Sequence, residues 1–369
     1  MSYKNSKSGE MRVRRGGRNR AVSSVHFNSE TFSSIAIVVA IFLLAVVACI
    51  FFAFFADVSF PVWNPSGNDQ PSFQNPEKTS PYATKTDKTQ FVASAGGEGL
   101  GGLALSSDYA ILIRVDDMTT LGYKNPDEVI YPASMTKVMT VITALDYINN
   151  LDDVYTVTKK VLNKVPYGSS TASIGIYFEN GENKLTVRDL LYGVSYMSGA
   201  DSVICLLDYL GLSVEEFVSL MNGKAKEIGL TNTRFGGAIG MDAENNQTTC
   251  RDMAAIMAYA MENEIARELF SGGKHPLDII EGYSYYHSTL DTLLGRMYTS
   301  ADVVLGNYTI LAAKSGLEDR AGYCLVSYIR NDETGEKYVL VTAKAEKHEW
   351  PYAANPIYDM IEIFEELNP

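Results

Sequence analysis

Hydrophobic and polar residues follow two patterns along the chain, and these patterns predict helices and strands. Between 138 and 148 the apolar residues fall on nearly every face of a helix, which predicts a central helix buried on all sides. A Ser or Thr followed three residues later by an acid predicts further helix starts at Thr186, Ser213 and Thr249. Runs rich in β-branched and aromatic residues predict strands over 109–115, 307–313, 321–330 and 337–343.

The order of these elements predicts the fold class. One strand precedes the helices and three follow them, the last two joined through 331–335 as a hairpin. A helix with an apolar stripe is then predicted from Asn355 toward the C-terminus. Segregation of strands from helices is typical of α+β proteins, so we expect an antiparallel sheet with a helical region beside it.

An uncharged stretch of 23 residues, 34–56, lies near the N-terminus. As a helix it would span roughly 34 Å, enough to cross the hydrocarbon core of a bilayer. Residues 1–33 carry a net charge of +5 and Asp57 follows the stretch. The positive-inside rule therefore places the N-terminus in the cytoplasm and everything after residue 57 outside the cell. A cleaved signal peptide is the alternative, but the stretch is long for one and no A-x-A site follows it.

These features divide the chain into four parts. A basic cytoplasmic tail (1–33) precedes the transmembrane helix (34–56), by which the protein would contact membrane lipid. An extracellular linker (57–103) is predicted to be flexible because it is rich in Pro, Ser, Asn, Thr and Gly and lacks periodicity. One folded extracellular domain is predicted over 104–369.

Charge and cysteine content exclude several classes of protein. The chain has 31 basic and 44 acidic residues, a net charge of −13, and the part after residue 33 accounts for −18. Phosphate binding requires clustered cations, so this acidic body excludes nucleic acid as its main partner. Cys205, Cys250 and Cys324 are an odd number without close pairs. They predict buried free thiols and no disulfide framework or zinc site.

Candidate chemistry begins with Ser134 and Lys137, which open the apolar stretch. Residues three apart lie on one face of a helix, so the Lys137 amine is expected to reach the Ser134 hydroxyl. A serine becomes a nucleophile when a base takes its proton, and burial lets a lysine act as that base. Pro132 suits a helix start, where unpaired amides could hold an oxyanion. Alone, Ser-x-x-Lys is not specific, because both residues are common, and an ordinary helix start is the simpler interpretation.

Two further motifs follow in order, Ser198-Gly199-Ala200 and Lys314-Ser315-Gly316. Each has a plain interpretation, the first as a turn and the second as the polar end of a strand. Together with Ser-x-x-Lys they form the ordered set typical of penicillin-binding proteins and class A β-lactamases.

From about residue 103 to residue 347 the chain resembles the low-molecular-mass penicillin-binding proteins, which are serine-type D-alanyl-D-alanine carboxypeptidases. Further similar stretches lie at 185–192, 229–235, 248–254 and 321–326. The resemblance implies a β-lactamase/transpeptidase-like fold. It also implies an extracellular enzyme that removes the terminal D-alanine of peptidoglycan stem peptides ending in D-Ala-D-Ala. Penicillins and other β-lactam antibiotics would acylate it, and no metal or other cofactor is expected.

The same resemblance implies roles for the catalytic residues. Ser134 would attack the carbonyl between the two D-alanines and form an acyl-enzyme that water then hydrolyses. Lys137 would be the base for acylation, kept neutral in part by repulsion from Lys314. Ser198 would pass a proton toward the leaving amine.

Substrate-binding roles follow in the same way. Lys314 and Ser315 would hold the terminal carboxylate of the substrate. The backbone N–H groups of Ser134 and Leu317 would form the oxyanion hole, and Gly316 would leave room for substrate along the strand.

Ala200 departs from the family pattern, which usually has Asn at this position. An Asn amide can bond both the substrate and the catalytic lysine, and a methyl group cannot. Loss of one positioned hydrogen bond would cost about 1–3 kcal/mol, which slows the reaction without abolishing it. Ser315 in place of the usual Thr keeps the hydroxyl.

Other classes of protein remain as alternatives. A Ser-His-Asp hydrolase is disfavoured because no Gly-x-Ser-x-Gly motif is present, and a zinc peptidase because His348-Glu349 lacks its second His. A class A-like β-lactamase would need a deacylating glutamate, for which Glu215 and Glu216 are candidates within a predicted helix start. A non-catalytic penicillin sensor or wall-binding module would account for Ala200.

Overall fold

The computed structural model describes residues 76–88, 90–166, 172–174, 183–273, 275–276, 284–285, 305–345 and 355–369. All of them belong to one compact unit, Ser72–Pro369. The predicted cytoplasmic tail (1–33) and transmembrane helix (34–56) lie outside the described residues. Within the described residues, no helix has both the length and the apolar character needed to cross a bilayer.

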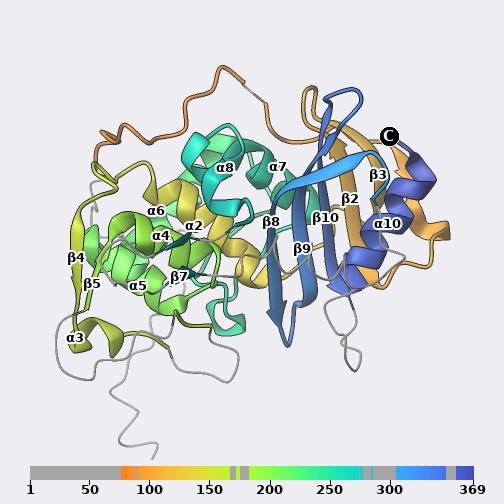
Figure 1. Cartoon of the computed structure of the whole chain (residues 1–369). Helices are drawn as coiled ribbons and strands as arrows, with labels where there is room; N and C mark the ends of the chain where they lie inside the picture. Colours follow the sequence, from red (N-terminus) through yellow and green to blue (C-terminus); the bar gives the residue numbers. More distant parts are fainter. Residues whose placement is uncertain are drawn as a thin grey trace, which may run out of the picture. The chain divides into compact units, whose positions relative to one another are not determined.

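A six-stranded sheet organises the unit, in the order β1-β3-β2-β10-β9-β8 (Figure 1). Its strands are β1 (Glu98–Gly99), β2 (Ser107–Arg114), β3 (Thr119–Lys124), β8 (Tyr308–Glu318), β9 (Gly322–Asn331) and β10 (Lys337–Ala345). Neighbouring strands are antiparallel except for β1 and β3. The expected antiparallel sheet and the hairpin at 331–335 are therefore confirmed, and β8 lies at an edge of the sheet.

Side chains of the central strands alternate between two hydrophobic clusters, as the period of two in a strand requires. On one face, Ile111, Val326 and Val341 pack against the helical region. On the other face, Leu112 and Leu340 pack against α10 (Asn355–Leu367). The helices and α10 lie on opposite sides of the sheet (Figure 1). The predicted α+β class is confirmed, and the sheet forms the middle of three layers.

The helical region contains one 3-10 turn at the site, seven α-helices and a short two-stranded sheet among the described residues. The 3-10 turn is η2 (Ala133–Met135), and the strands of the small sheet are β4 (Val154–Val157) and β5 (Asn183–Thr186). The helices are α2 (Thr136–Ala144), α3 (Lys159–Leu162), α4 (Val187–Ser195), α5 (Ala200–Tyr209), α6 (Val214–Ile228), α7 (Cys250–Ala260) and α8 (Glu264–Phe270). Short elements η1 (Leu100–Gly102), η3 (Asp242–Glu244), β6 (His275–Pro276) and β7 (Ser284–Tyr285) complete the described set.

The three predicted helix starts are confirmed by their caps. The hydroxyls of Thr186, Ser213 and Thr249 each accept a hydrogen bond from the backbone N–H three residues later. At Thr186 and Ser213 the acid also bonds back to the cap, which completes a capping box. The predicted buried thiols Cys205, Cys250 and Cys324 are free and buried.

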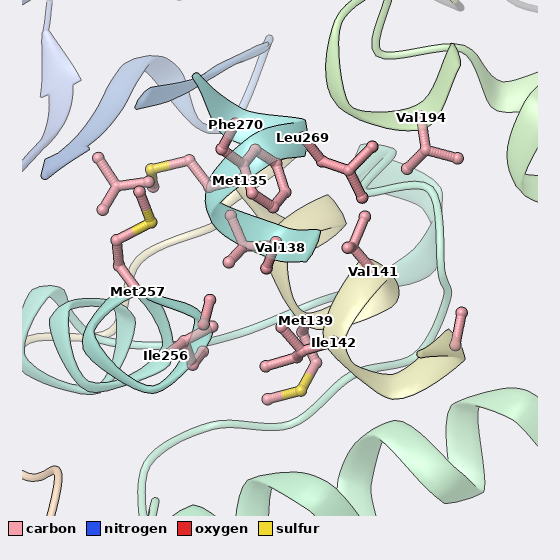
Figure 2. Close-up of a cluster of buried hydrophobic side chains, with 14 of the residues drawn as sticks. Met135, Val138, Met139, Val141, Ile142, Val194, Ile256, Met257, Leu269 and Phe270 are labelled. Atoms are coloured by element: carbon pink, nitrogen blue, oxygen red, sulfur yellow. The ribbon is translucent and has the colours of Figure 1, made fainter. Parts of the chain in front are cut away.

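Helix α2 is central, as its apolar pattern predicts, because all nine of its residues are buried. Figure 2 shows Val138, Val141 and Ile142 of this helix among side chains of α7 and α8. Packing on every side removes water from the helix and from any polar group it carries. This burial decides the chemistry of Lys137, described below.

Two predicted elements differ from the structure. The single helix expected from Pro132 onward is a 3-10 turn followed by α2, which ends at Ala144. Strand β8 extends through Glu318, so the Lys-Ser-Gly motif lies within the strand and not at its end. The 3-10 turn brings Ser134 to the start of the helix, and the longer strand brings the second motif alongside it.

The predicted flexible linker (57–103) is wrong for its described part, 76–88 and 90–103. Phe91 is 4% exposed and stacks edge-on against Tyr259, and Leu100 is 1% exposed. The Ser80 hydroxyl donates to the carbonyl of Ile148. A few apolar residues within a polar composition are enough to bind this segment to the domain, and composition alone did not reveal them.

Candidate active site

Ser134 lies in the middle of η2, immediately before α2. The turn is fixed in place, because the Met135 N–H donates to the Pro132 carbonyl at 3.0 Å and Ala133 is 3% exposed. Ala133 has a φ of 47°, in the left-handed region that non-glycine residues rarely occupy. Such a conformation costs roughly 1 kcal/mol or more and persists only where the surroundings enforce it. The backbone that presents Ser134 is therefore fixed by its packing.

Lys137 reaches Ser134, as the spacing predicts. Its Nζ donates to the Ser134 Oγ at 3.1 Å and to the backbone carbonyl of Ile239 at 2.6 Å. The residue is 1% exposed, and burial lowers the pKa of Lys137 to about 8. Negative charge on Glu244, Glu318 and Asp201 opposes that shift. A substantial fraction of Lys137 is then neutral near pH 8, which an ordinary lysine is not.

Strand β8 brings the Lys314-Ser315-Gly316 motif against the Ser134 turn. A Cβ atom placed on Gly316 would lie 2.7 Å from the carbonyl oxygen of Pro132 and 3.2 Å from the backbone nitrogen of Ser134. Only glycine permits this close approach. Two motifs 180 residues apart in sequence, at Ser134 and Lys314, are thus in direct contact.

Lys314 and Gly316 are buried, while Ser315 and Leu317 are exposed. Lys314 is 1% exposed, its Nζ donates to the Ser315 carbonyl at 2.9 Å, and it forms no ion pair with a carboxylate of the described residues. Burial and repulsion from Lys137 lower the pKa of Lys314 well below its ordinary value. The predicted proximity of the two lysines is therefore present.

Ser198 lies in the turn between α4 and α5 and has a φ of 55°. Its Oγ is buried and has no hydrogen-bond partner among the described residues. The turn is fixed by a bond from the Gly199 N–H to the Gly193 carbonyl at 2.9 Å. Asp201 is one of the charges that act on Lys137, which places this turn within electrostatic range of the lysine.

Ala200, the departure from the family pattern, is the first residue of α5 and is fully buried. Its backbone N–H donates to the carbonyl of Ala172 at 2.8 Å. The side chain of Ala200 is a methyl group, so it offers no hydrogen bond to the Ser198 Oγ in the same turn. The unpartnered hydroxyl and the missing amide therefore occur in the same turn.

A loop that sequence reasoning did not single out, residues 236–246, completes the surroundings of Lys137. The loop supplies the Ile239 carbonyl to Lys137 and the Ala238 carbonyl to the Thr140 hydroxyl at 2.7 Å. A Cβ on Gly240, which has a φ of +90°, would lie 2.1 Å from the Ala133 carbonyl. The glycines of this stretch were the available signal, since they allow close approach to the Ser134 turn.

Arg320, also missed, joins this loop to the end of β8. Its guanidinium lies 3.8 Å from the centre of the Tyr131 ring, and its Nη1 donates to Asn245 Oδ1 at 2.9 Å. The Arg320 N–H donates to Asp242 Oδ2 at 2.8 Å. The bridge holds three segments around the site together, those before Ser134, after Gly316 and around Glu244.

This arrangement can perform nucleophilic chemistry without a metal. A hydroxyl beside a buried amine of lowered pKa can be deprotonated by it, and a second buried amine can bind an anionic ligand, whose charge favours the protonated form of that amine. Within the described part of the chain, no three His, Cys, Asp or Glu side chains gather so as to hold a metal ion.

Glu215 and Glu216, the candidates for a β-lactamase glutamate, start α6. Glu216 bonds the Ser213 N–H at 2.8 Å and Glu215 is exposed. Both therefore act as ordinary first-turn acids, as the helix-start interpretation predicts.

Comparison with known proteins identifies the family. Residues 97–346 match the model of peptidase S11, described as D-alanyl-D-alanine carboxypeptidase. The chain is 36% identical over 169 residues to the D-alanyl-D-alanine carboxypeptidase DacF of Bacillus subtilis, covering 45% of this chain and 41% of that protein. It is 38% identical over 165 residues to DacC of Escherichia coli, covering 43% and 40% respectively. The chain thus spans about two fifths of the length of these relatives.

A solved structure shares the fold. Penicillin-binding protein D2 of Listeria monocytogenes, determined in its cefotaxime-bound form, superposes with a TM-score of 0.58 at 23% sequence identity, covering 73% of this chain and 99% of that one. The expected resemblance in fold is therefore confirmed. Since the family model covers well over half of the sequence, this chain belongs to the D-alanyl-D-alanine carboxypeptidase family, peptidase S11.

Proposed function

We propose that this protein is a serine carboxypeptidase that removes the terminal D-alanine from peptidoglycan stem peptides ending in D-Ala-D-Ala. The observation that carries the proposal is the contact between the Ser134 hydroxyl and the buried Lys137 amine, with the Lys314 strand packed against them. Membership of peptidase S11 supports the same activity. Ser134 attacks the scissile carbonyl, D-alanine leaves, and water hydrolyses the acyl-enzyme.

Each remaining motif has a role in this proposal. Lys137 takes the Ser134 proton, which its lowered pKa favours. Lys314 and Ser315 bind the substrate carboxylate, and that negative charge stabilises the protonated form of Lys314. Ser198, whose buried hydroxyl has no partner among the described residues, relays a proton to the leaving amine.

The oxyanion hole is proposed to consist of the backbone N–H groups of Ser134 and Leu317. The short distance between the Gly316 position and the Ser134 nitrogen supports this pairing, because Leu317 directly follows Gly316. Strand β8 is an edge strand, so an extended peptide can lie alongside it.

β-Lactam antibiotics are proposed to acylate Ser134. A structural neighbour is a penicillin-binding protein with bound cefotaxime, and the family set of Ser-x-x-Lys, Ser and Lys-Ser-Gly is present here. A β-lactam contains a strained amide and a nearby carboxylate, which correspond to the scissile amide and the terminal carboxylate of the peptide. It would therefore present the same groups to Ser134 and Lys314 as the peptide does.

We further propose that residues 34–56 hold the protein in the cell membrane as a single span. The N-terminal tail (1–33) lies in the cytoplasm, the residues after the span form an extracellular linker up to the described domain, and the catalytic domain is extracellular. The uncharged stretch and the basic residues before it support this topology. Protease treatment of intact cells should digest the domain and spare the tail.

The test of the function uses the full chain in detergent with two probes, a D-Ala-D-Ala-ended stem peptide and a fluorescent penicillin. Release of D-alanine together with covalent labelling supports the carboxypeptidase. Labelling without D-alanine release indicates a penicillin-binding sensor, which Ala200 favours as the second candidate function. Rapid turnover of penicillin indicates a β-lactamase, and absence of both reactions contradicts the assigned site.

A further inference from the structure

Glu244, at the end of η3, has its carboxylate held by the backbone of its own loop. One oxygen accepts from the Ile239 N–H at 3.2 Å. The other accepts from the N–H groups of Gly240 and Met241, the latter at 3.0 Å, and from Asn246 Nδ2 at 3.2 Å. Three consecutive N–H groups directed at one carboxylate form an anion-binding nest.

The loop is shaped to accommodate this carboxylate. A Cβ on Gly237 would lie 2.1 Å from the Glu244 Cδ, and a Cβ on Gly236 would lie 2.0 Å from the Glu244 carbonyl oxygen. A Cβ at position 237 would therefore clash with the Glu244 side chain in the nest, and a Cβ at position 236 would clash with the Glu244 backbone. The side chain and its surroundings fit one another closely, which a surface carboxylate would not require.

The nest determines where the loop presents its carbonyl to Lys137. Glu244 binds the N–H of Ile239, and the carbonyl of the same residue accepts from Lys137 Nζ at 2.6 Å. Asn246 ties the loop to the start of α2, because its Nδ2 donates to the Thr136 hydroxyl at 3.2 Å. Thr136 directly precedes Lys137. The loop therefore contacts the Lys137 side chain through Ile239 and the preceding residue through Asn246.

We propose that Glu244 is a positioning residue for Lys137, which orients the Ile239 carbonyl toward the lysine and places a carboxylate charge in the loop that binds it. The inference rests on the proposed acylation of Ser134. Glu244 does not contact Ser134 in the described structure. Both of its oxygens already accept N–H groups, which distinguishes it from a glutamate that activates water.

Four charged groups act on Lys137 or are acted on by it. Glu244 is the largest of the charge contributions that raise the pKa of Lys137, followed by Glu318 of β8 and Asp201 of α5. Lys314 of β8 is the nearby cation, coupled to Lys137 by repulsion. Removal of the Glu244 charge alone is therefore expected to lower the pKa of Lys137.

The experiment measures the second-order rate of fluorescent-penicillin labelling against pH for the full chain. Glu244→Gln keeps the size of the side chain and one acceptor oxygen but removes its charge. We expect the acidic limb of its profile to move down by about one pH unit relative to the wild-type protein. Glu244→Asp keeps the charge but shortens the reach, so we expect slower labelling with the acidic limb near its wild-type position.

Glu216→Gln is the matched control, because Glu216 also bonds a backbone N–H but starts α6 on the surface. Its profile should match that of the wild-type protein. An acidic limb that stays in place in Glu244→Gln, with Glu244→Asp as fast as wild type, would overturn the inference. Failure of the wild-type protein to be labelled at any pH would instead contradict the proposed function itself. If Glu244→Gln does not fold, an unimpaired rate in Glu244→Asp still overturns the inference.

Discussion

Two buried lysines lie near opposite ends of helix α2 and have different partners. Lys224 of α6 faces Asp146, just beyond the end of α2, with Nζ 2.5 Å from Oδ2 and both side chains 2% exposed. Among the described residues, Lys137, in the first turn of α2, has no carboxylate in direct contact and donates only to a hydroxyl and a carbonyl. Burial lowers the pKa of both lysines, and Asp146 opposes that shift at Lys224 directly.

The difference separates a structural lysine from a reactive one. An ion pair compensates the desolvation of Lys224, and Lys78 adds a second cation 3.1 Å from Asp146. The desolvation of the charged Lys137 amine is not compensated by an ion pair within the described part of the chain. Its neutral form is therefore accessible near pH 8. A buried amine without a counter-ion is expensive for folding and useful for proton transfer.

The largest effect is expected when the reactive lysine, Lys137, is replaced. Lys137→Met should slow penicillin labelling by about 10³-fold or more, because general bases contribute roughly 10²–10⁴ in rate. Its free energy of unfolding should not fall, since the change removes an unpaired buried charge. Labelling rates and urea unfolding measure the two quantities. Ser134→Ala serves as the zero-labelling reference, and labelling that survived Ser134→Ala would refute the assigned nucleophile.

The structural side of the comparison should show the reverse behaviour. Lys224→Met leaves Asp146 buried with only Lys78, so we expect a loss of about 3 kcal/mol in the free energy of unfolding, at the low end for a broken buried pair. Labelling of the folded protein should stay within about twofold of the wild-type rate. A large loss of labelling at full stability would show that Lys224 also acts on the site.

The pH dependence of stability sharpens the comparison at Lys137. Its pKa is about 8 in the folded protein and 10.5 in the unfolded chain, so between these values the unfolded state binds more protons. Stability contributed by this residue therefore rises with pH through that window. From pH 7 to pH 9.5, the unfolding free energy of wild-type protein should gain about 2 kcal/mol relative to Lys137→Met. A constant difference would contradict the lowered pKa.

Much of this site follows from local sequence rules, and the rest depends on tertiary contacts. Ser134 and Lys137 are three residues apart, so helix geometry alone predicts their contact, and capping pairs such as Thr186 with Asp189 are equally local. The approach of Gly316 to Ser134 required the family resemblance, because no local rule links residues so far apart.

Glu244 could not be predicted as part of the site from its own neighbourhood. Its significance depends on three backbone N–H groups that converge only when the 236–246 loop folds onto α2. The prediction that the described part of the linker is flexible was wrong for a related reason. Phe91 and Leu100 are isolated apolar residues in a polar segment, and only the folded domain offers the surfaces that bury them.

The smallest expected effect concerns the turn between α4 and α5, where Ser198 Oγ lacks a partner among the described residues. Asn at position 200 would add an amide able to bond this hydroxyl or the substrate. Because one such bond contributes about 1 kcal/mol, we expect Ala200→Asn to leave the rate of D-alanine release unchanged or raise it by up to about fivefold.

Ala200→Leu is the control for that prediction, since leucine branches at Cγ as asparagine does but is larger and has no amide. It should crowd a fully buried position and lower the rate without any compensating bond. A rate that fell equally in both variants would show that the turn has repacked around the methyl group. In that case the Ser198 hydroxyl works in this protein without a neighbouring amide.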